Sequence, residues 1–269
     1  MAETAIEWTH RRLPDGVVLP GYTFNIVWGC TKVSEGCKHC YADALATRFG
    51  HRVWGPQASR RVMGPAYWRT PFHWNQEAKA QGYRRLVFCS SMADVFEDHR
   101  TVNQEREKLW SLIDQTPWLV WLLLTKRPEN ILRMAPYGIQ WPPHIWVGAS
   151  VENQGRAEER IPHLLQVLAE VRFLSCEPLL GSLDLSGYLS RLEWVIAGGE
   201  SGSHARPMQM DWVRSLRDQC WDVRTPFFFK QIGGRTHASG GRLLDGRTYD
   251  EMPLVLQQTD SWQWQGRRF

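Results

Sequence analysis

Short apolar runs that end abruptly in small or polar residues recur along the chain. They are FNIVW (24–28), RLVFC (85–89), WLVWLLL (118–124), HIWVGA (144–149), VRFLS (171–175), EWVIA (193–197) and PFFF (226–229). Each run is continuously apolar rather than strictly alternating, which is typical of strands covered on both faces, as in a parallel sheet wrapped by helices. The pattern therefore predicts seven buried strands.

Helix-like stretches lie between several of these runs, at 102–115, 152–170 and 211–223. A repeated strand–helix order predicts an α/β fold, a (β/α) TIM-like barrel that is either full or partial. The longer gap after the first run leaves room for an insertion near 50–80. A doubly wound open sheet is the competing topology.

Residues 1–235 are predicted to form the barrel, since no linker or low-complexity tract divides them. The segment 236–269 then follows as a cap and a tail. Its stretch GGRLLDGRTYDEMP contains the Gly and Asp-Gly residues that are typical of tight turns, which predicts a small β-hairpin.

The composition is that of a globular protein, because 43% of the 269 residues are hydrophobic. No apolar stretch is long enough to span a membrane, and the start MAETAIEWTHRR lacks the apolar region of a secretory signal. We therefore expect a cytoplasmic protein without a membrane partner. Lys and Arg number 32 against 28 Asp and Glu, a balance that permits an anionic partner without requiring one.

Polar residues cluster directly after the predicted strands. They occur in SSMAD (90–94), TKRPEN (125–130), SVEN (150–153), CEP (176–178), GGESG (198–202) and KQIGG (230–234). In a (β/α) barrel the carboxyl ends of the strands meet at one mouth, where working groups gather. We expect these loops to build the functional site.

The stretch CTKVSEGCKHC carries Cys30, Cys37 and Cys40, three of the six cysteines of the chain. They could hold a zinc ion, with a remote histidine or Cys89 as a fourth ligand, or an iron–sulfur cluster. A disulfide is disfavoured in a chain without an export signal. A further alternative is a hydrolase that holds a hard divalent metal through carboxylates at the mouth, Asp94, Glu152, Glu177 and Glu200, but it leaves the cysteines without a role.

The cysteine stretch resembles the cluster loop of radical S-adenosylmethionine enzymes. Cys37, Lys38, His39 and Cys40 match the second half of that motif, whereas the first gap holds six residues instead of the usual three. The resemblance implies a 4Fe-4S cluster bound by three thiolates, whose fourth iron stays open for S-adenosyl-L-methionine. It also implies a full or partial barrel with the loop after the first strand.

Motifs along nearly the whole chain resemble a phage-and-bacterial family of unknown function, the three-cysteine-motif proteins, which is placed near the radical S-adenosylmethionine barrels. These motifs are IEWT, GCTKVSEGCKHCYA, FCSSMADVF, LLLTKRPE, VGASVEN, FLSCEPLLG, WVIAGGESG, FFKQIGG and LLDGRTYDEMP. Spore photoproduct lyase is a more distant likeness, which makes a nucleic-acid substrate conceivable.

The resemblance implies an enzyme that receives an electron from a donor protein and generates a 5'-deoxyadenosyl radical. Its substrate would be anionic, such as a nucleic acid or nucleotide to be modified or repaired. The alternative is a non-catalytic barrel whose cysteines hold zinc or an iron–sulfur cluster while it binds nucleic acid or a partner protein.

Roles can be carried onto residues by the same resemblance. Ser90, Ser91 and Asp94 are candidates for the amino-acid end of the cofactor, and Ser150 and Glu152 for its ribose. We also place Lys126 and Asn153 in the cofactor site. The candidate catalytic residues are Cys176, as a hydrogen-atom donor, Glu177 and Glu200.

Overall fold

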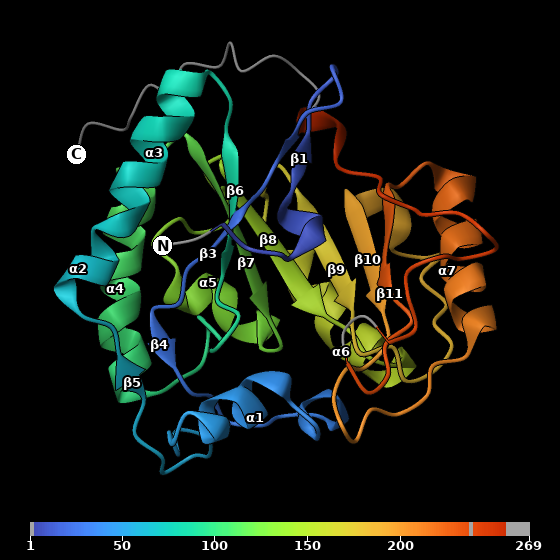
Figure 1. Cartoon of the computed structure of the whole chain (residues 1–269), viewed down its shortest axis with the longest axis horizontal. Coiled ribbons are helices and arrows are strands. Elements are labelled where there is room, and N and C mark those ends of the chain that lie inside the picture. The colour runs from blue at the N-terminus through green and yellow to red at the C-terminus, as the bar shows by residue number, and fades with distance from the viewer. Residues whose placement is uncertain (1–2, 237–238, 257–269) are drawn as a thin grey trace.

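The computed structural model describes residues 3–236 and 239–256 of the chain (Figure 1). The strands are β1 (Arg11–Arg12), β2 (Val18–Leu19), β3 (Tyr22–Thr23), β4 (Val27–Trp28), β5 (Arg61–Val62), β6 (Arg85–Cys89), β7 (Leu119–Thr125), β8 (Ile145–Ser150), β9 (Arg172–Cys176), β10 (Trp194–Gly198) and β11 (Phe227–Gln231). The α-helices are α1 (Tyr41–Arg48), α2 (Pro65–Trp68), α3 (Thr70–Gln81), α4 (Arg100–Asp114), α5 (Ile131–Met134), α6 (Gln154–Leu164) and α7 (Met210–Val223). Short 3-10 helices are η1 (Glu7–Thr9), η2 (Glu35–Cys37), η3 (Pro128–Asn130), η4 (Leu189–Arg191) and η5 (Leu254–Leu256).

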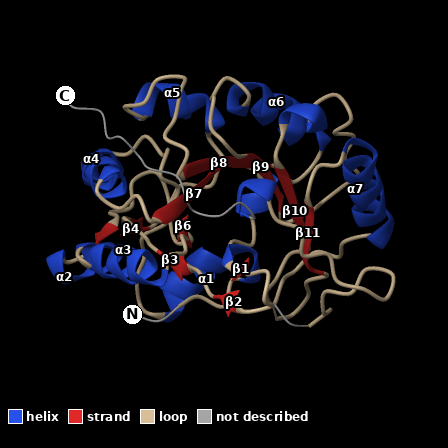
Figure 2. Ribbon diagram, turned by 90° about the horizontal axis from the view of Figure 1, so that it is seen from above, coloured by secondary structure: helices blue, strands red, loops and turns tan. Residues whose placement is uncertain are grey.

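The main sheet has seven strands, whose spatial order β3-β6-β7-β8-β9-β10-β11 follows the chain. Every neighbouring pair in it is parallel. Figure 2 shows the sheet as a curved arc with α4, α5, α6 and α7 along its convex side. The sequential order excludes the doubly wound alternative, in which the order would reverse at a switch point. The prediction of a partial TIM-like barrel is confirmed at the level of a curled, parallel half-barrel.

Six of the seven predicted strands are confirmed as β6 to β11. The first is confirmed only in part: the run 24–28 contains β4, but the main sheet is entered by β3, just before this run. After Phe24 donates its N–H to Phe88 O, the chain turns away from the sheet. The Asn25 side chain accepts a hydrogen bond from Met92 N, and Val27 and Trp28 instead pair with β5 of the insertion.

Two apolar layers cover the sheet. One packs between the strands and the convex-side helices, and includes Leu123, Val147 and Cys176. The other fills the concave side, where Trp8 of η1 packs against Phe88 and Trp194. Alternate residues of each strand therefore face opposite layers, so the direction of a side chain near a strand end follows from its register.

The segment before residue 256 contains the predicted tight turn. Leu244 and Arg247 form an antiparallel bridge around Asp245 and Gly246, whose φ angles are 53° and 83°. Such positive φ values suit a two-residue hairpin turn. The remainder of the predicted tail, 257–269, lies outside the described residues.

Within the described residues, no helix combines the length and apolarity needed to cross a bilayer.

Candidate functional site at the mouth of the half-barrel

The cysteine loop, which we define as residues 30–40, connects β4 to α1 and lies at the carboxyl edge of the sheet. In Figure 1, α1 runs below the ends of the strands. Cys30, Cys37 and Cys40 are all partly exposed and none forms a disulfide. The loop itself has little regular structure besides η2, so contacts from elsewhere in the chain must fix it.

The first such contact fixes the start of the loop through its backbone. Thr31 N donates to Oε1 of Glu97 at 2.8 Å, and Thr31 O accepts from Nη2 of Arg127 at 2.6 Å. Nη1 of Arg127 also lies 3.6 Å from Sγ of Cys30. Arg60, from the insertion, holds both carboxylate oxygens of Glu97 at 2.9 and 2.8 Å. Because Arg60, Glu97 and Arg127 are buried, these charged hydrogen bonds are protected from water.

Asp94, predicted to bind the cofactor, belongs to the same buried network. Its Oδ1 accepts from Phe96 N at 3.0 Å and from Thr125 Oγ1 at 2.7 Å. Its Oδ2 accepts from Lys126 N at 3.1 Å and from Arg127 Nη1 at 2.8 Å. Both oxygens are thus engaged by protein donors, and the carboxylate acts on the cysteine loop through Arg127.

A second contact fixes the middle of the loop. Glu152, which follows β8, is fully buried, and its Oε1 accepts from Gly36 N at 3.2 Å. Its other oxygen accepts from Nη1 of Arg160 at 2.8 Å. A Cβ atom added at Gly36 would lie 2.8 Å from Oε1 of Glu152, so only glycine allows this approach.

Asn153 reinforces the second contact from the same strand end. Its Oδ1 accepts from Arg156 N and caps α6, while its Nδ2 donates to Oε1 of Glu35 at 2.7 Å. Arg156 donates to the other oxygen of Glu35 at 3.0 Å. Hydrogen bonds from the backbone N–H of Glu35 itself, from Asn153 and from Arg156 lower the pKa of Glu35 to about 2.

A third contact reaches the end of the loop from β10. Nδ1 of His39 lies 3.3 Å from Oε2 of Glu200, which is also held by Nε of Arg206 at 2.8 Å. Burial raises the pKa of Glu200, but the hydrogen bonds from Arg206 outweigh this effect and leave the pKa below its ordinary value. The predicted catalytic Glu200 is therefore an anion that neighbours the cysteine loop.

Charged groups of both signs surround the thiols. Burial raises the pKa of Cys30 to about 12, with a contribution from Asp94 that Arg127 partly offsets. Burial also raises the pKa of Cys40, while backbone N–H groups at the start of α1 and the nearby charge of Lys126 act in the opposite direction. Lys32 lies within electrostatic range of both Cys40 and Cys37. Binding of a metal would deprotonate the thiols, and these cations would then compensate the thiolate charge.

The donor set fits an iron–sulfur cluster chemically. Three reduced, partly exposed thiols share one loop, and cysteine thiolate is the ligand that such clusters use. Within residues 3–236 and 239–256, no group of three or more His, Cys, Asp or Glu side chains already converges so as to hold a metal ion.

Polar side chains of the concave face gather next to the loop. Ser150 of β8 is in register with Ser175 of β9, and both are buried. Nζ of Lys230 lies 2.6 Å from Oε1 of Glu177, and both side chains are partly exposed. A Cβ atom added at Gly198 would lie within 3.6 Å of both of these side chains, which places Gly198 between the two on the same face.

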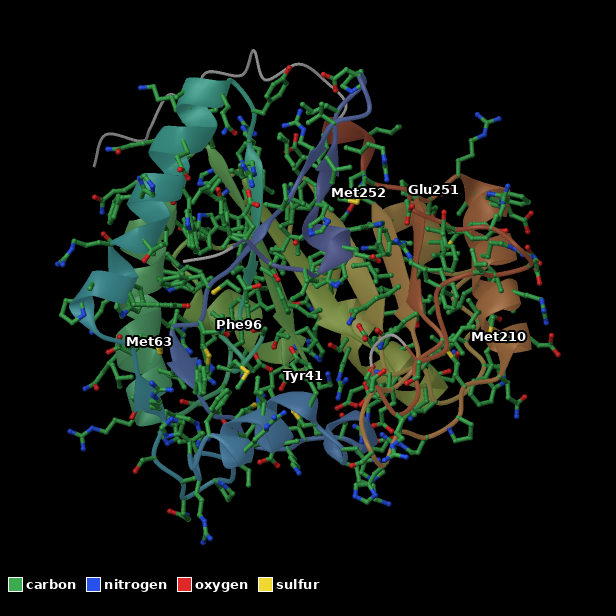
Figure 3. The ribbon with its side chains drawn as sticks, in the orientation of Figure 1. Tyr41, Met63, Phe96, Met210, Glu251 and Met252 are labelled. Carbon is green, nitrogen blue, oxygen red and sulfur yellow. The ribbon has the colours of Figure 1, made fainter. Side chains whose placement is uncertain are left out.

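The predicted Ser90 and Ser91 lie at the end of β6. Ser90 is buried and its Oγ contacts Sγ of Cys89 at 3.3 Å. Ser91 exchanges a hydrogen bond with Asn25, and its carbonyl accepts from the hydroxyl of Tyr41 at 2.9 Å. Figure 3 shows Tyr41 between α1 and the ends of the central strands. Tyr41 therefore borders the mouth opposite the sheet.

Cys176 is placed differently from the other predicted site residues. It is fully buried in the convex-side layer, close to Cys220 of α7, and burial raises the pKa of its thiol. Its register neighbour in β10 is Ala197 of the same layer. The thiol thus faces the helices, whereas Glu177 one position later faces the concave side.

A cavity of about 350 Å³ lies behind the start of the cysteine loop. It is lined by Thr31 and Val33 of the loop, by the segments that follow β6 and β7, and by α6. Lys126 and Arg127 contribute to its wall. The cavity therefore adjoins the charged network around Cys30.

The residues that hold the loop include several that the sequence analysis did not single out, although Gly36 and Arg127 lie within stretches that it named. They are Gly36, Arg60, Glu97, Arg127 and Arg160. Glu97 and Arg127 follow predicted strands, so their position was a usable signal. Arg60 lies in the insertion and Arg160 inside a helix, where nothing in the spacing marks them.

Comparisons with known proteins give few matches. A search of curated proteins finds none. Among solved structures, spore photoproduct lyase complexed with dinucleoside spore photoproduct matches with a TM-score of 0.42 and 11% identity, over 74% of this chain and 60% of that one. A mutant lyase with bound AdoMet and dinucleoside spore photoproduct matches with a TM-score of 0.39 and 12% identity, over 75% and 61% of the two chains. The chain thus spans about 60% of the length of these lyase chains.

The family comparison covers far more of the sequence. The model of one family matches residues 3–253, which is nearly the full length. The chain belongs to this family, which is described as "Protein of unknown function (DUF5131)".

Proposed function

We propose that the protein is a radical S-adenosylmethionine enzyme that binds a 4Fe-4S cluster through Cys30, Cys37 and Cys40 and acts on an anionic substrate. The observation that carries this proposal is the attachment of the cysteine loop. Contacts from the ends of β6, β7, β8 and β10 hold it at the mouth of a parallel half-barrel. A loop held only for stability would not need three free thiols at this position.

The three thiolates would hold the cluster, with Lys32, Lys126 and Arg127 as the nearby compensating cations. When bound, the cluster would supply an electron, received from a donor protein, for reductive cleavage of S-adenosyl-L-methionine to a 5'-deoxyadenosyl radical. The protein residues bind and orient the reactants and keep water out.

For the cofactor, we assign Ser90, Ser91, Lys126 and Ser150 as binding residues, because they lie at strand ends around the loop. Asp94, Glu152 and Asn153 are assigned as positioning residues, since their side chains contact the loop or the arginine that holds it. Their removal should disturb the cluster site before it disturbs cofactor affinity.

For the substrate, we assign the concave-side pair Glu177 and Lys230. Lys230 can offset a negative charge on the substrate, and Glu177 orients its ammonium group. Glu200 is a second candidate at the same mouth, where Arg206 keeps it ionised.

Anaerobic purification tests the proposal. We expect brown protein with roughly four irons per chain and cluster-dependent formation of 5'-deoxyadenosine in the presence of a reductant. C30A, C37A and C40A should each abolish both signals. C220A is the matched control, since Cys220 is a buried thiol in α7 outside the loop.

Two results would contradict the proposal. Colourless protein with stoichiometric zinc would instead indicate a structural or binding module. Cofactor cleavage that survives removal of all three loop cysteines would exclude any cluster bound by the loop.

A further inference from the structure

The positive charge of the chain is concentrated around the cysteine loop. Residues 28–62 contain six Lys and Arg against two Asp and Glu. The remaining residues of the chain contain 26 of each sign, so this one segment carries the whole net charge of +4. Segments of this kind attract polyanions by electrostatics alone.

Several of these cations are exposed and unpaired. The side chains of Arg48 and Arg52 are exposed, and neither forms an ion pair with any residue that the structure describes. Arg61 is also exposed and lies over the ring of Trp28, with its guanidinium carbon 4.6 Å from the ring centroid. The two acidic groups of the segment are already engaged, Glu35 with Arg156 and Asp43 with Lys32.

Exposed aromatic side chains accompany the cations. Phe49, at the end of α1, is 61% exposed, and Tyr41, at its start, is 54% exposed. The ring centroid of Phe49 lies 6.3 Å from that of Trp28, which in turn lies 5.7 Å from that of His51. A large apolar ring that remains this exposed in a folded protein is available for stacking.

Tyr41, Leu45, Arg48 and Phe49 follow one side of α1, and Arg52 and Arg61 lie in the segments that come after it. Ala42 and Ala46 point into a small apolar cluster with Val53, while Tyr41, Leu45 and Arg48 stay exposed. Residues three and four positions apart share one side of a helix, so Tyr41, Leu45, Arg48 and Phe49 form a continuous stripe. Its Tyr41 end borders the mouth and directly follows Cys40 (Figure 3).

We infer that this surface, formed by Tyr41, Leu45, Arg48, Phe49, Arg52 and Arg61, binds single-stranded nucleic acid and leads it into the mouth. Unpaired arginines match the phosphates, and exposed rings match unstacked bases, which only a single strand offers freely. The inference rests on the proposed function for what happens at the mouth. The binding itself requires no catalysis.

Fluorescence anisotropy of the full-length, anaerobically purified protein with a labelled oligothymidylate tests the inference. We expect saturable binding that weakens roughly tenfold or more between about 50 and 200 mM salt, as expected when three or four phosphates are neutralised. A duplex of equal length should bind more weakly. R48Q/R52Q should reduce both the affinity and the salt dependence.

Matched variants separate this surface from general charge effects. K79Q/R191Q removes two exposed cations near the amino ends of β6 and β10, neither of which forms an ion pair with a residue in the described part of the chain, and should leave binding unchanged. F49A should weaken binding roughly tenfold through lost stacking. I139A, which truncates an apolar side chain that is 59% exposed outside this surface, should not.

Each outcome decides between the two proposals. Equal losses for R48Q/R52Q and K79Q/R191Q, or no binding of the oligonucleotide, would overturn the inference. If cofactor cleavage is observed without oligonucleotide binding, the proposed function stands and the inference fails. If the oligonucleotide binds but the protein contains no cluster, the inference stands and the proposed function fails.

Discussion

Gly36 and Glu152, which are 116 residues apart in the sequence, are joined by a hydrogen bond of 3.2 Å from the Gly36 amide to Oε1 of the carboxylate. This bond ties the middle of the cysteine loop to the end of β8. The Glu152 carboxylate cannot move away easily, because it is fully buried and its other oxygen accepts a hydrogen bond from Arg160. The pair therefore sets where Cys37 and its neighbours lie relative to the sheet.

Substitution of Gly36 by alanine should break the hydrogen bond between Gly36 and Glu152. The new Cβ would approach Oε1 of Glu152 to 2.8 Å, so the loop or the carboxylate must move and the hydrogen bond is lost. We expect a loss of about 1–3 kcal/mol in the free energy of unfolding, together with a lower iron content per chain. Urea titration and iron analysis measure the two effects. G64A is the control, since a Cβ there meets nothing within 4 Å; equal behaviour of the two variants would contradict the prediction.

Substitution of Arg127 by methionine should be costly. It removes the buried partner of Asp94 and the donors to Thr31 O and Cys30 Sγ, which leaves a buried carboxylate without its ion pair. We expect a loss of about 3–5 kcal/mol in the free energy of unfolding. R133M breaks the exposed pair with Asp98 and should cost at most about 1 kcal/mol. Comparable urea midpoints for the two variants would count against a buried role for Arg127.

His144 should make the fold sensitive to acid. Burial, only partly opposed by a hydrogen bond to Ile113 O, lowers its pKa from 6.5 to about 4. Because the folded-state pKa is the lower one, the unfolded chain binds the proton first as the pH falls. The stabilisation is complete above about pH 6.5 and is lost progressively down to about pH 4, to a total of about 3 kcal/mol.

Unfolding in urea at several pH values between those limits measures this effect. H144N should flatten the pH dependence, although it also lowers stability at neutral pH. H73N serves as the control, because the His73 side chain is 70% exposed. An unchanged slope for H144N would show that other groups cause the acid sensitivity.

Glu177 and Cys176 are adjacent in sequence but face opposite sides of the sheet. Because Glu177 is partly exposed next to Lys230, E177Q should reduce substrate turnover roughly a hundredfold while the melting temperature and iron content stay close to wild type. C176A should change turnover less than about twofold, since its thiol faces Cys220 in the helix-side layer. A large loss of turnover in C176A, with normal iron content, would instead support a hydrogen-atom donor role.

The sequence pattern predicts the sheet well because each of its long buried strands coincides with a local apolar run. β6 to β11 each coincide with such a run, and α4, α6 and α7 lie where the helix-like stretches predict them. The first run was assigned to the wrong sheet for a tertiary reason. The apolar run 24–28 is buried by the insertion, with Trp28 paired to Arg61, whereas the short β3 has no run of its own.

The candidate site was only partly predictable. Its location at the carboxyl ends of the strands follows from parallel topology, and the cysteines stand out by their spacing. The contacts of Asp94, Glu152 and Asn153 could not be derived, because they depend on how the cysteine loop folds back over the sheet. Residue type predicts that these side chains are hydrogen-bonded, but it does not identify the partner.

The cysteine loop depends on residues that are distant from it in the sequence. Its anchors lie 66, 96, 116 and 161 residues away in the sequence. A peptide with only the three cysteines would keep the thiols but lose every contact that orients them. The same would hold for this loop transplanted onto another scaffold. Under the proposed function, metal binding would therefore depend on the completed half-barrel, and a truncation before β10, which removes the contact from Glu200, should loosen the end of the loop even though all three cysteines remain.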